Sequence, residues 1–373
     1  MPDGGMRITL VGPAYPWPGG LPLLVTDLAH RLTAEGHEVR MQTWTRQGPA
    51  RLLPTRPLTA PEGAVFPAEP GSLSWRNPLD GWRAGRHAAR SDLVVVVHYT
   101  TLQAPVLATI GRAARRGARV VVICANAVPH ERRPGDRLLL ALLLRSVDAA
   151  VVHTEAERTA LAALADRPVA VAALPPHLPD GPPRARARGT RRRLLFFGKV
   201  RRYKGVDLLL QALTGLPDLA LTVAGEVYPD AAGLPALVDR LGLRDRVDLL
   251  PGYLPAPEIP ALFAAADALV LPYRSATASQ HVALAHRHGL PVVATRVGNF
   301  PDGVHDGVDG LLCAPGDVAD LTRALRELYV PGRLEALRAA IPVTDDEQVW
   351  KTYLETLLTA GDRAQGRRPR LGG

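Results

Sequence analysis

The sequence is poor in cysteine, in aromatic residues and in long apolar runs. Its two cysteines, Cys124 and Cys313, both end short apolar segments. Two thiols cannot form a disulfide framework, so we expect buried, reduced side chains in a cytoplasmic protein. The nearest approach to a membrane span, Leu138–Leu144, is far shorter than the roughly 20 apolar residues that a span needs. The N-terminus also lacks an extended apolar signal region.

Acidic residues are outnumbered by basic ones. The formal net charge is +9 and the pI is about 10.0, with much of the excess in Arg184–Arg193 and in the tail Arg363–Arg370. This balance fits nucleic acid, an anionic membrane surface or solubility alone. The basic runs contain no interleaved aromatic residues and accompany no recognisable binding module, which argues against nucleic acid. A peripheral position at the inner face of the membrane stays open.

A length of 373 residues with 47% hydrophobic content predicts two domains. In the first half, short Val/Leu-rich runs alternate with helical patterns, which is typical of a parallel sheet covered on both faces. Residues 46–82, rich in proline, glycine and arginine, are predicted to form a long irregular excursion. The strands that we expect in this half are Arg7–Val11, Glu38–Trp44, Leu93–Val97, Val120–Ala125, Ala149–Val152 and Val169–Leu174.

Pro175–Pro183 marks a linker, after which the alternation restarts. The strands that we expect there are Leu194–Phe197, Leu219–Ala224, Val247–Leu250, Leu269–Pro272 and Pro291–Ala294. The expected fold is therefore α/β, with two doubly wound, Rossmann-like domains facing a central cleft. We place the first domain at 1–177, with the C-terminal helix 345–360 packing back on it, the second at 178–344, and a basic flexible tail at 361–373.

One connection in the second half has the features of an anion site. The predicted strand 194–197 ends at Gly198, two lysines follow at Lys199 and Lys204, and Gly205 leads into a helical pattern. The N–H groups of a helix N-terminus, its positive dipole end and two ammonium groups together suit a phosphate. The alternative is an ordinary strand-to-helix connection with two solvated lysines.

The second half resembles the retaining glycosyltransferases of the GT-B fold, in family four of that enzyme class. The matching segments are FFGKVRRYKGVDLLLQAL at 196–213, LTVAGE at 221–226, VDLLPGYLPAPEIPALFAAADALVLPY at 247–273 and HGLPVVATRVGNFPDGVHDGVDGLLCAPGD at 288–317. The first half is more loosely similar, through MRITLVGPAYPWPGG and AEGHEV. Three further segments resemble a narrower bacterial branch: TRQGPARLLP, NP at 77–78 and ICANAVPHERRP at 123–134. The resemblance therefore covers nearly the whole chain.

The resemblance implies a donor site. In such enzymes, one cation follows the glycine at the end of the strand and a lysine precedes the next glycine, and the two hold the donor diphosphate. The residues at these positions here are Lys199 and Lys204. Gly19-Gly20, ahead of the first long helix, resembles the family's glycine loop, which comes close to donor phosphate and acceptor, and glycine permits that backbone approach. Further donor contacts carried over from the family are Gly225, Glu226, Tyr253 and Leu254. For Tyr253 the alternative is a surface residue at a strand-end turn.

The chain departs from the family at two glutamates, which are replaced by Ala276 and Leu284. The first usually sits by the transferred sugar and the second by the nucleotide ribose. The narrower branch carries a small polar loop there instead. The hydroxyl and amide groups of Thr277, Ser279 and Gln280 are candidates for hydrogen bonds to phosphate or sugar. Plain helix capping explains them equally well.

A second departure leaves the catalytic base open. Many relatives carry a histidine where this chain has Ala125, followed by Asn126 on the acceptor side. His98, His130 and Glu131 are candidates to orient an acceptor hydroxyl or accept its proton. For His98, a structural role at the strand end is the alternative.

The resemblance therefore implies a retaining, metal-independent transfer of a sugar from a nucleotide-sugar, of UDP or GDP type, to an acceptor hydroxyl. The acceptor is a sugar, a lipid-linked saccharide or a small molecule, in polysaccharide, glycolipid or secondary-metabolite biosynthesis. No cofactor, metal or nucleic-acid partner is expected. Because the glutamates and the histidine are missing, a catalytically silent scaffold that binds a nucleotide or a partner protein is the alternative.

Overall fold

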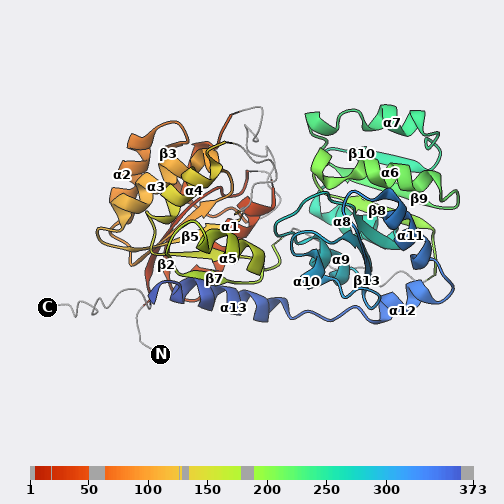
Figure 1. Cartoon of the computed structure of the whole chain (residues 1–373). Coiled ribbons are helices and arrows are strands. Elements are labelled where there is room, and N and C mark those ends of the chain that lie inside the picture. The colour runs from red at the N-terminus through yellow and green to blue at the C-terminus, as the bar shows by residue number, and fades with distance from the viewer. Residues whose placement is uncertain are drawn as a thin grey trace. The chain divides into compact units, whose positions relative to one another are not determined.

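The computed structural model describes residues 5–17, 19–49, 64–125, 127, 134–177 and 189–362. The chain divides into two compact units (Figure 1). The first comprises Met1–His177 and Asp346–Gly373, and the second comprises Leu178–Asp345. Among the described residues, no helix is both long and apolar enough to cross a membrane.

The first unit contains a parallel sheet of seven strands in the order β3-β2-β1-β4-β5-β6-β7. Val, Ile and Leu side chains of its central strands are fully buried, as expected of a sheet covered on both faces. The strands are β1 (Arg7–Val11), β2 (Glu38–Arg46), β3 (Ala68–Ser74), β4 (Leu93–His98), β5 (Arg119–Cys124), β6 (Ala149–Val152) and β7 (Val169–Val171).

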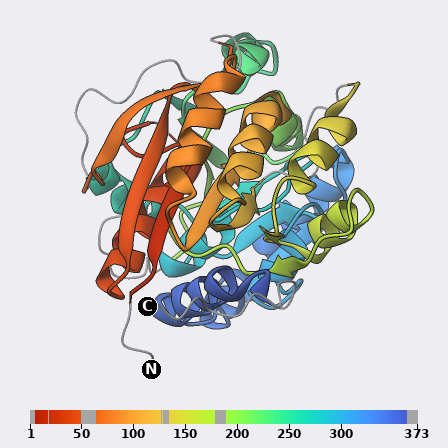
Figure 2. The ribbon, with the colours of Figure 1, turned by 90° about the vertical axis from the view of Figure 1, so that its left-hand side faces the viewer.

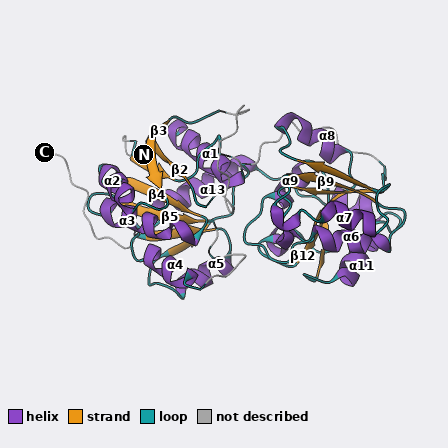
Figure 3. Ribbon diagram, turned by 90° about the horizontal axis from the view of Figure 1, so that it is seen from above, coloured by secondary structure: helices purple, strands orange, loops and turns teal. Residues whose placement is uncertain are grey.

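Helices cover both faces of this sheet (Figure 3). Alternate residues of the strands point to opposite faces, so Val95 packs with α1 and α13 whereas Val94 and Val96 pack with α3 and α4. The helices are α1 (Gly20–Ala34), α2 (Pro78–Ala88), α3 (Ala104–Ala114), α4 (Asp136–Leu144), α5 (Glu155–Ala162) and α13 (Asp346–Thr359), with the short 3₁₀ helix η1 (Thr101–Gln103).

The helix α13 belongs to the first unit although it ends the described chain. The indole Nε1 of Trp350 donates to the carbonyl oxygen of Pro176 at 2.9 Å. The guanidinium of Arg31 lies 4.6 Å from the Trp350 ring centroid and forms two hydrogen bonds with Glu347, at 2.7 and 2.8 Å. The last residues of the first unit before residue 178 and the helix that begins at residue 346 are therefore hydrogen-bonded to each other.

The second unit contains a parallel sheet of six strands in the order β10-β9-β8-β11-β12-β13. The strands are β8 (Arg193–Phe197), β9 (Ala220–Gly225), β10 (Val247–Pro251), β11 (Ala268–Leu271), β12 (Val292–Thr295) and β13 (Gly310–Cys313). The helices are α6 (Val206–Thr214), α7 (Leu234–Arg240), α8 (Ile259–Ala264), α9 (His281–Arg287), α10 (Phe300–Gly303), α11 (Val318–Leu328) and α12 (Arg333–Ala339), with the 3₁₀ helices η2 (Arg202–Lys204), η3 (Pro229–Ala231) and η4 (Ala256–Glu258).

The excursion predicted at residues 46–82 was wrong in its second part. β3 and the start of α2 lie there, although Pro70 and Gly71 interrupt the strand pattern. β3 is an edge strand with an irregular register against β2, and an edge strand tolerates proline because one side of it needs no ladder. β13, a four-residue strand in a glycine-rich segment, was not among the expected strands.

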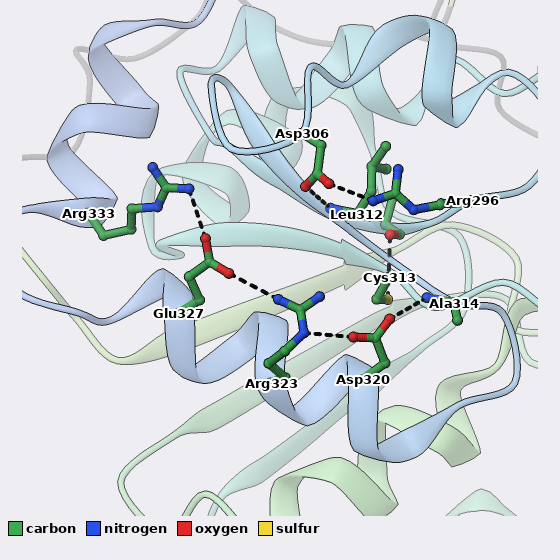
Figure 4. A network of polar contacts seen from close by, with 10 residues as sticks. Arg296, Asp306, Leu312, Cys313, Ala314, Asp320, Arg323, Glu327 and Arg333 are labelled. Atoms are coloured by element: carbon green, nitrogen blue, oxygen red, sulfur yellow. Dashed lines mark hydrogen bonds and ion pairs between the residues drawn. The ribbon is translucent and has the colours of Figure 1, made fainter.

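A network of ion pairs fixes β13 against α11 (Figure 4). The Asp320 carboxylate accepts from the backbone N–H of Ala314 at 2.7 Å and from Arg323 at 2.7 Å. Arg323 also contacts Glu327, and Glu327 contacts Arg333. This connection ties the end of β13 to two successive helices of the second unit.

Candidate functional site

In the second unit, the connection from β8 to α6 packs tightly against two neighbouring strand ends. Gly198 (φ 114°), Gly205 (φ 69°) and Gly225 (φ 142°) all lie in backbone regions that favour glycine. A Cβ at Gly205 would overlap the carbonyl oxygen of Pro272, and one at Gly225 would overlap that of Gly198. The absence of side chains therefore lets the carboxyl ends of β8, β9 and β11 converge on one loop.

The two predicted lysines both lie in this loop, each against an aromatic ring. Lys204 is 6% exposed, and its Nζ lies 4.9 Å from the centroid of the Tyr273 ring. The Nζ of Lys199 lies 5.6 Å from the centroid of the Tyr228 ring. Within the described part of the chain, neither lysine forms an ion pair with a carboxylate. The alternative of two solvated lysines is therefore wrong for Lys204, because its side chain is buried.

Burial makes the charged form of these lysines costly. It lowers the pKa of Lys204 to about 7, and the positive charges of Lys199 and Arg201 act in the same direction. Burial also lowers the pKa of Lys199, although the Glu226 carboxylate opposes this shift. The loop thus gathers three cations, of which the two lysines form no ion pair with a carboxylate among the described residues, and such an excess of positive charge favours the binding of an anion.

The segment after β9 runs beside this loop. The backbone N–H of Val200 donates to the Glu226 carbonyl oxygen at 2.8 Å, and that of Tyr228 donates to the Val200 carbonyl oxygen at 3.0 Å. The structure therefore brings the predicted donor residues Gly225 and Glu226 together with Lys199. The neighbouring N–H of Gly252 donates to the Gly225 carbonyl oxygen at 3.2 Å, which places the segment of Tyr253 and Leu254 next to the same loop. Tyr253 is 50% exposed.

Sequence reasoning missed Arg201 as a third cation of the loop. Its guanidinium lies 4.6 Å from the Tyr228 ring centroid, and its Nε donates to the Asp230 carboxylate at 3.0 Å. Arg201 and Lys199 thus both lie against the Tyr228 ring. The signal was present in the sequence, because Arg201 stands between the two lysines, but no motif pointed to Tyr228 or Asp230.

The small polar loop ahead of α9 is held by Asn299. The Asn299 Oδ1 accepts from the backbone N–H of Ser279 at 2.8 Å, and its Nδ2 donates to the Ser279 carbonyl oxygen at 3.1 Å. The Oγ of Ser279 lies 2.8 Å from Nδ1 of His281. Thr277 and Gln280 are buried, and Gln280, at the N-cap of α9, forms no side-chain cap hydrogen bond. Capping therefore does not account for Gln280, and the roles of Thr277 and Ser279 stay predictions.

In the first unit, His98 ends β4 and is fully buried. Its Nδ1 lies 3.4 Å from Sγ of Cys124, and within the described residues its Nε2 has no hydrogen-bond partner. Burial lowers the pKa of His98 to about 4, against the opposing charge of Asp136. His98 is therefore neutral near pH 7, as an imidazole that accepts a proton or a hydrogen bond must be.

The other predicted acceptor-side residues are divided between described and undescribed parts. Gly20 begins α1, and Gly19 is its N-cap with φ 121°. Asn126, His130 and Glu131 lie outside the described residues, as does the tail from residue 363 onward.

A cluster of neutral polar side chains lies near His98 in the chain and was not predicted. Nε2 of Gln103 donates to the Gln47 carbonyl oxygen at 2.7 Å and to the Tyr99 hydroxyl at 3.2 Å. Gln47 and Gln103 are both buried. Gln47 follows β2 and Tyr99 follows β4, so the cluster lies at the carboxyl edge of the sheet. Neutral residues far apart in sequence match no motif, so the sequence held no signal for them.

Among the described residues, no group of three or more His, Cys, Asp or Glu side chains is placed to hold a metal ion. Asp306, the second aspartate of the segment 302–307, accepts from the backbone N–H of Leu312 at 2.8 Å and from Arg296 at 2.6 Å (Figure 4). Burial raises the pKa of the nearby Cys313 thiol to about 12, so this cysteine is an unreactive core residue.

The depressed pKa of Lys204 predicts that anion binding takes up a proton. Above pH 7 the amine of the free protein is mostly neutral, and a bound diphosphate favours the charged form and raises its pKa. We expect the affinity for an added nucleoside diphosphate to fall by up to about tenfold per pH unit above pH 7. Titration calorimetry at pH 8 in two buffers of different ionisation enthalpy should give different heats. Equal heats in both buffers, or a difference that persists in a Lys204→Met variant, would contradict this linkage.

Both units are Rossmann-like, and two such units are the architecture of the GT-B fold. Sucrose-phosphate synthase from Thermosynechococcus elongatus superposes with a TM-score of 0.70 at 19% identity, covering 96% of this chain and 98% of that one. Anabaena HepE, solved in complex with UDP and glucose, also gives a TM-score of 0.70 at 19% identity, covering 95% and 100%. At this level of identity the likeness concerns the fold.

Sequence comparison identifies the family. Residues 18–177 match the model of Glycosyltransferase Family 4, and residues 191–330 match that of Glycosyl transferases group 1. A D-inositol 3-phosphate glycosyltransferase of Catenulispora acidiphila is 31% identical over 366 residues, covering 86% of this chain and 85% of that protein. The match to the enzyme of that name from Mycobacterium sp. strain KMS is 35% identical over 152 residues and spans about a third of its length, 34%. The chain belongs to the family-4 glycosyltransferases.

Proposed function

We propose that this protein transfers a sugar from a nucleotide-sugar donor to an acceptor hydroxyl, with retention of anomeric configuration and without a metal ion. The observation that carries the proposal is the pair Lys199 and Lys204, two cations in one glycine loop that form no ion pair with a carboxylate among the described residues. A donor diphosphate supplies the missing negative charge, and the lysines supply the positive charge that a metal ion would otherwise bring.

The composition of the chain strengthens this interpretation. The sequence contains three lysines, at positions 199, 204 and 351, against 42 arginines. A chain that uses arginine at nearly every cationic position nevertheless has two of its three lysines in this loop. An ammonium is a compact point charge on a flexible stem, and its pKa shifts when it is buried, whereas a guanidinium is planar and permanently charged. We therefore infer that these two positions of the loop require an ammonium group and not a guanidinium.

The chemistry follows from where charge develops. As the bond from the anomeric carbon to the diphosphate oxygen breaks, negative charge grows on the diphosphate, and Lys199 and Lys204 stabilise it. Because Ala276 and Leu284 replace the family's glutamates, no carboxylate at those positions acts as nucleophile. The acceptor hydroxyl then attacks from the face that the diphosphate leaves, and its proton passes to a diphosphate oxygen. His98 is the candidate on the first unit to orient that hydroxyl.

For the donor we favour a uridine diphosphate sugar, because HepE, which shares the fold, was solved with UDP and with UDP-glucose. For the acceptor we favour a polyhydroxylated molecule, free or lipid-linked, because the Catenulispora acidiphila relative, which covers 86% of this chain, is named for an inositol phosphate. A silent scaffold that only binds a nucleotide is the second candidate, and it rests on the replaced glutamates and Ala125.

The small number of lysines offers a direct test of the donor site. An amine-acetylating reagent can be applied at pH 7.5 with UDP, GDP, dTDP or ADP, and the acetylation of each lysine followed by mass spectrometry. We expect UDP to protect Lys199 and Lys204 and to leave Lys351 unaffected, because Lys351 lies exposed on α13. No protection by any nucleotide would overturn the donor site. Protection without release of UDP from UDP-glucose in the presence of polyol acceptors would favour the scaffold.

A further inference from the structure

The outward stripe of α2 combines apolar and cationic side chains. Leu79, Trp82, Arg83 and Arg86 follow one another at the spacing of a single helix face. Leu79 is 64% exposed and Trp82 45% exposed, and the Arg86 guanidinium lies 5.4 Å from the Trp82 ring centroid. Leu79 and Trp82 therefore do not belong to the hydrophobic core of this unit.

The opposite side of α2 packs against α3, which leaves the side with Leu79 and Trp82 exposed to solvent. A Cβ at Gly81 would lie 2.9 Å from the Val106 carbonyl oxygen, and one at Gly85 would lie 2.5 Å from that of Ile110. These glycines let α2 pack closely on α3, and α4 packs on the other side of α3. The three helices form one layer over the sheet (Figure 2). We call its solvent side the α2–α4 face.

The first turn of α4 adds a third exposed apolar residue. Leu138 is 70% exposed and its neighbour Arg137 is exposed. Each of α2, α3 and α4 follows the carboxyl end of one parallel strand and leads to the amino end of the next. Their N-termini therefore lie at the same edge of the layer. Leu79 and Trp82 on α2 and Leu138 on α4 therefore all lie toward this edge, which is also the edge at which β4 ends in His98.

The exposed arginines of this face form no ion pair with a carboxylate in the described part of the chain. In the described residues from 75 to 145 there are three carboxylates: Asp80 accepts from Asn77 at 2.8 Å, Asp92 pairs with Arg7, and the buried Asp136 accepts from Thr101 at 2.6 Å. Within the described residues, none of the exposed arginines of α2, α3 and their flanks forms an ion pair with a carboxylate. These arginines are Arg76, Arg83, Arg86, Arg90, Arg112 and Arg116.

We propose that the α2–α4 face docks on an anionic phospholipid membrane, with Leu79, Trp82 and Leu138 in the interface and the arginines on lipid phosphates. Tryptophan and leucine beside arginine on one helix face suit the boundary between headgroups and acyl chains. Basic side chains near an anionic leaflet add electrostatic attraction. A nucleic acid would neutralise the arginines but would leave Leu79 and Leu138 in water, so the membrane accounts for both kinds of side chain.

Docking would bring the carboxyl edge of the first sheet to the lipid surface. If the proposed glycosyl transfer holds, which this step rests on, the acceptor is then lipid-linked. Docking itself does not depend on the transfer, so each can fail without the other.

The test is sedimentation of the full-length protein with vesicles of phosphatidylcholine, with or without 30% phosphatidylglycerol. We expect binding to the anionic vesicles, weakening as salt rises from 0.1 to 0.5 M. An apolar variant, Leu79→Gln with Trp82→Gln and Leu138→Gln, and a charge variant, Arg83→Gln with Arg86→Gln and Arg116→Gln, should each lose at least tenfold in vesicle affinity. All these positions are exposed, so both variants should fold and keep wild-type UDP binding.

A matched control changes exposed residues of the second unit: Val308→Gln, Val330→Gln and Arg240→Gln. The two valines are 53% and 54% exposed, and this variant should bind vesicles as the wild type does. Three results would overturn the proposal: equal binding by the wild type and both face variants, binding independent of phosphatidylglycerol, or displacement of the protein from vesicles by a short duplex DNA with retained affinity of the apolar variant for that DNA.

Discussion

Lys204→Met should weaken UDP binding by about 10- to 100-fold, because a hydrogen bond to a charged group contributes about 1.5–3 kcal/mol. The same substitution should raise the stability of the ligand-free protein slightly. Lys204 is 6% exposed, has no carboxylate partner among the described residues and has a pKa of about 7. Its ammonium is therefore costly to bury until an anion arrives. Methionine has a similar length and removes that cost.

The substitution should weaken UDP binding but stabilise the ligand-free protein. This combination distinguishes a lysine that binds a ligand from one that stabilises the fold. The measurement is the midpoint of thermal unfolding for wild type and variant, without nucleotide and with UDP at a fixed concentration. The wild type should be stabilised by UDP and the variant should not, while the ligand-free variant unfolds at an equal or higher temperature. Lys351→Met on the exposed face of α13 is the matched control, with no change in either measurement.

A lower unfolding temperature of the ligand-free variant, together with an undiminished UDP shift, would show that Lys204 serves packing against Tyr273. That result would remove the observation on which the proposed donor site rests. For this reason the Lys204 variant is informative even before the transferred sugar and its acceptor are known.

The sequence allowed the two sheets to be predicted because buried parallel strands are continuous Val/Leu runs, as in Leu93–His98. It also pointed to Lys199, Lys204 and their glycines, since a strand, a glycine, cations and a helix follow one another locally. It gave no sign that Tyr273 and Tyr228 would lie against the two lysines. Those contacts join residues tens of positions apart, and no local pattern encodes them.

The same reason explains the missed β3. Its strand character comes from pairing with β2 at the sheet edge, whereas its own proline and glycine argue against a strand. Gln47, Tyr99 and Gln103 were missed because neutral polar side chains give no periodic or charge signal. The α2–α4 face could be predicted only in part. Its arginines contribute to the net charge of the sequence, but the exposure of Leu79 and Leu138 depends on the packing of α2 and α4.

Asp267→Ala should destabilise the second unit by about 3–5 kcal/mol, the cost of removing one partner of a buried ion pair. Asp267 is fully buried directly before β11. Its carboxylate accepts from Nη2 of Arg338 at 3.0 Å, from the Tyr329 hydroxyl at 3.2 Å and from the backbone N–H of Arg191 at 2.9 and 3.0 Å. Loss of the carboxylate leaves the Arg338 guanidinium, which is 12% exposed, without its counter-charge.

The transition of the second unit in a calorimetric scan should fall by roughly 10 °C, given a shift of about 2–4 °C per kcal/mol for a domain of this size. Asp248→Ala is the matched control: Asp248 also pairs with an arginine, Arg193, but its side chain is 59% exposed, so its loss should cost less than about 1 kcal/mol. Asp267→Ala with Arg338→Leu should recover part of the loss, because the unpaired cation is gone. If the double variant is no more stable than Asp267→Ala, the carboxylate acts mainly by fixing the backbone at Arg191, and the ion pair with Arg338 contributes little.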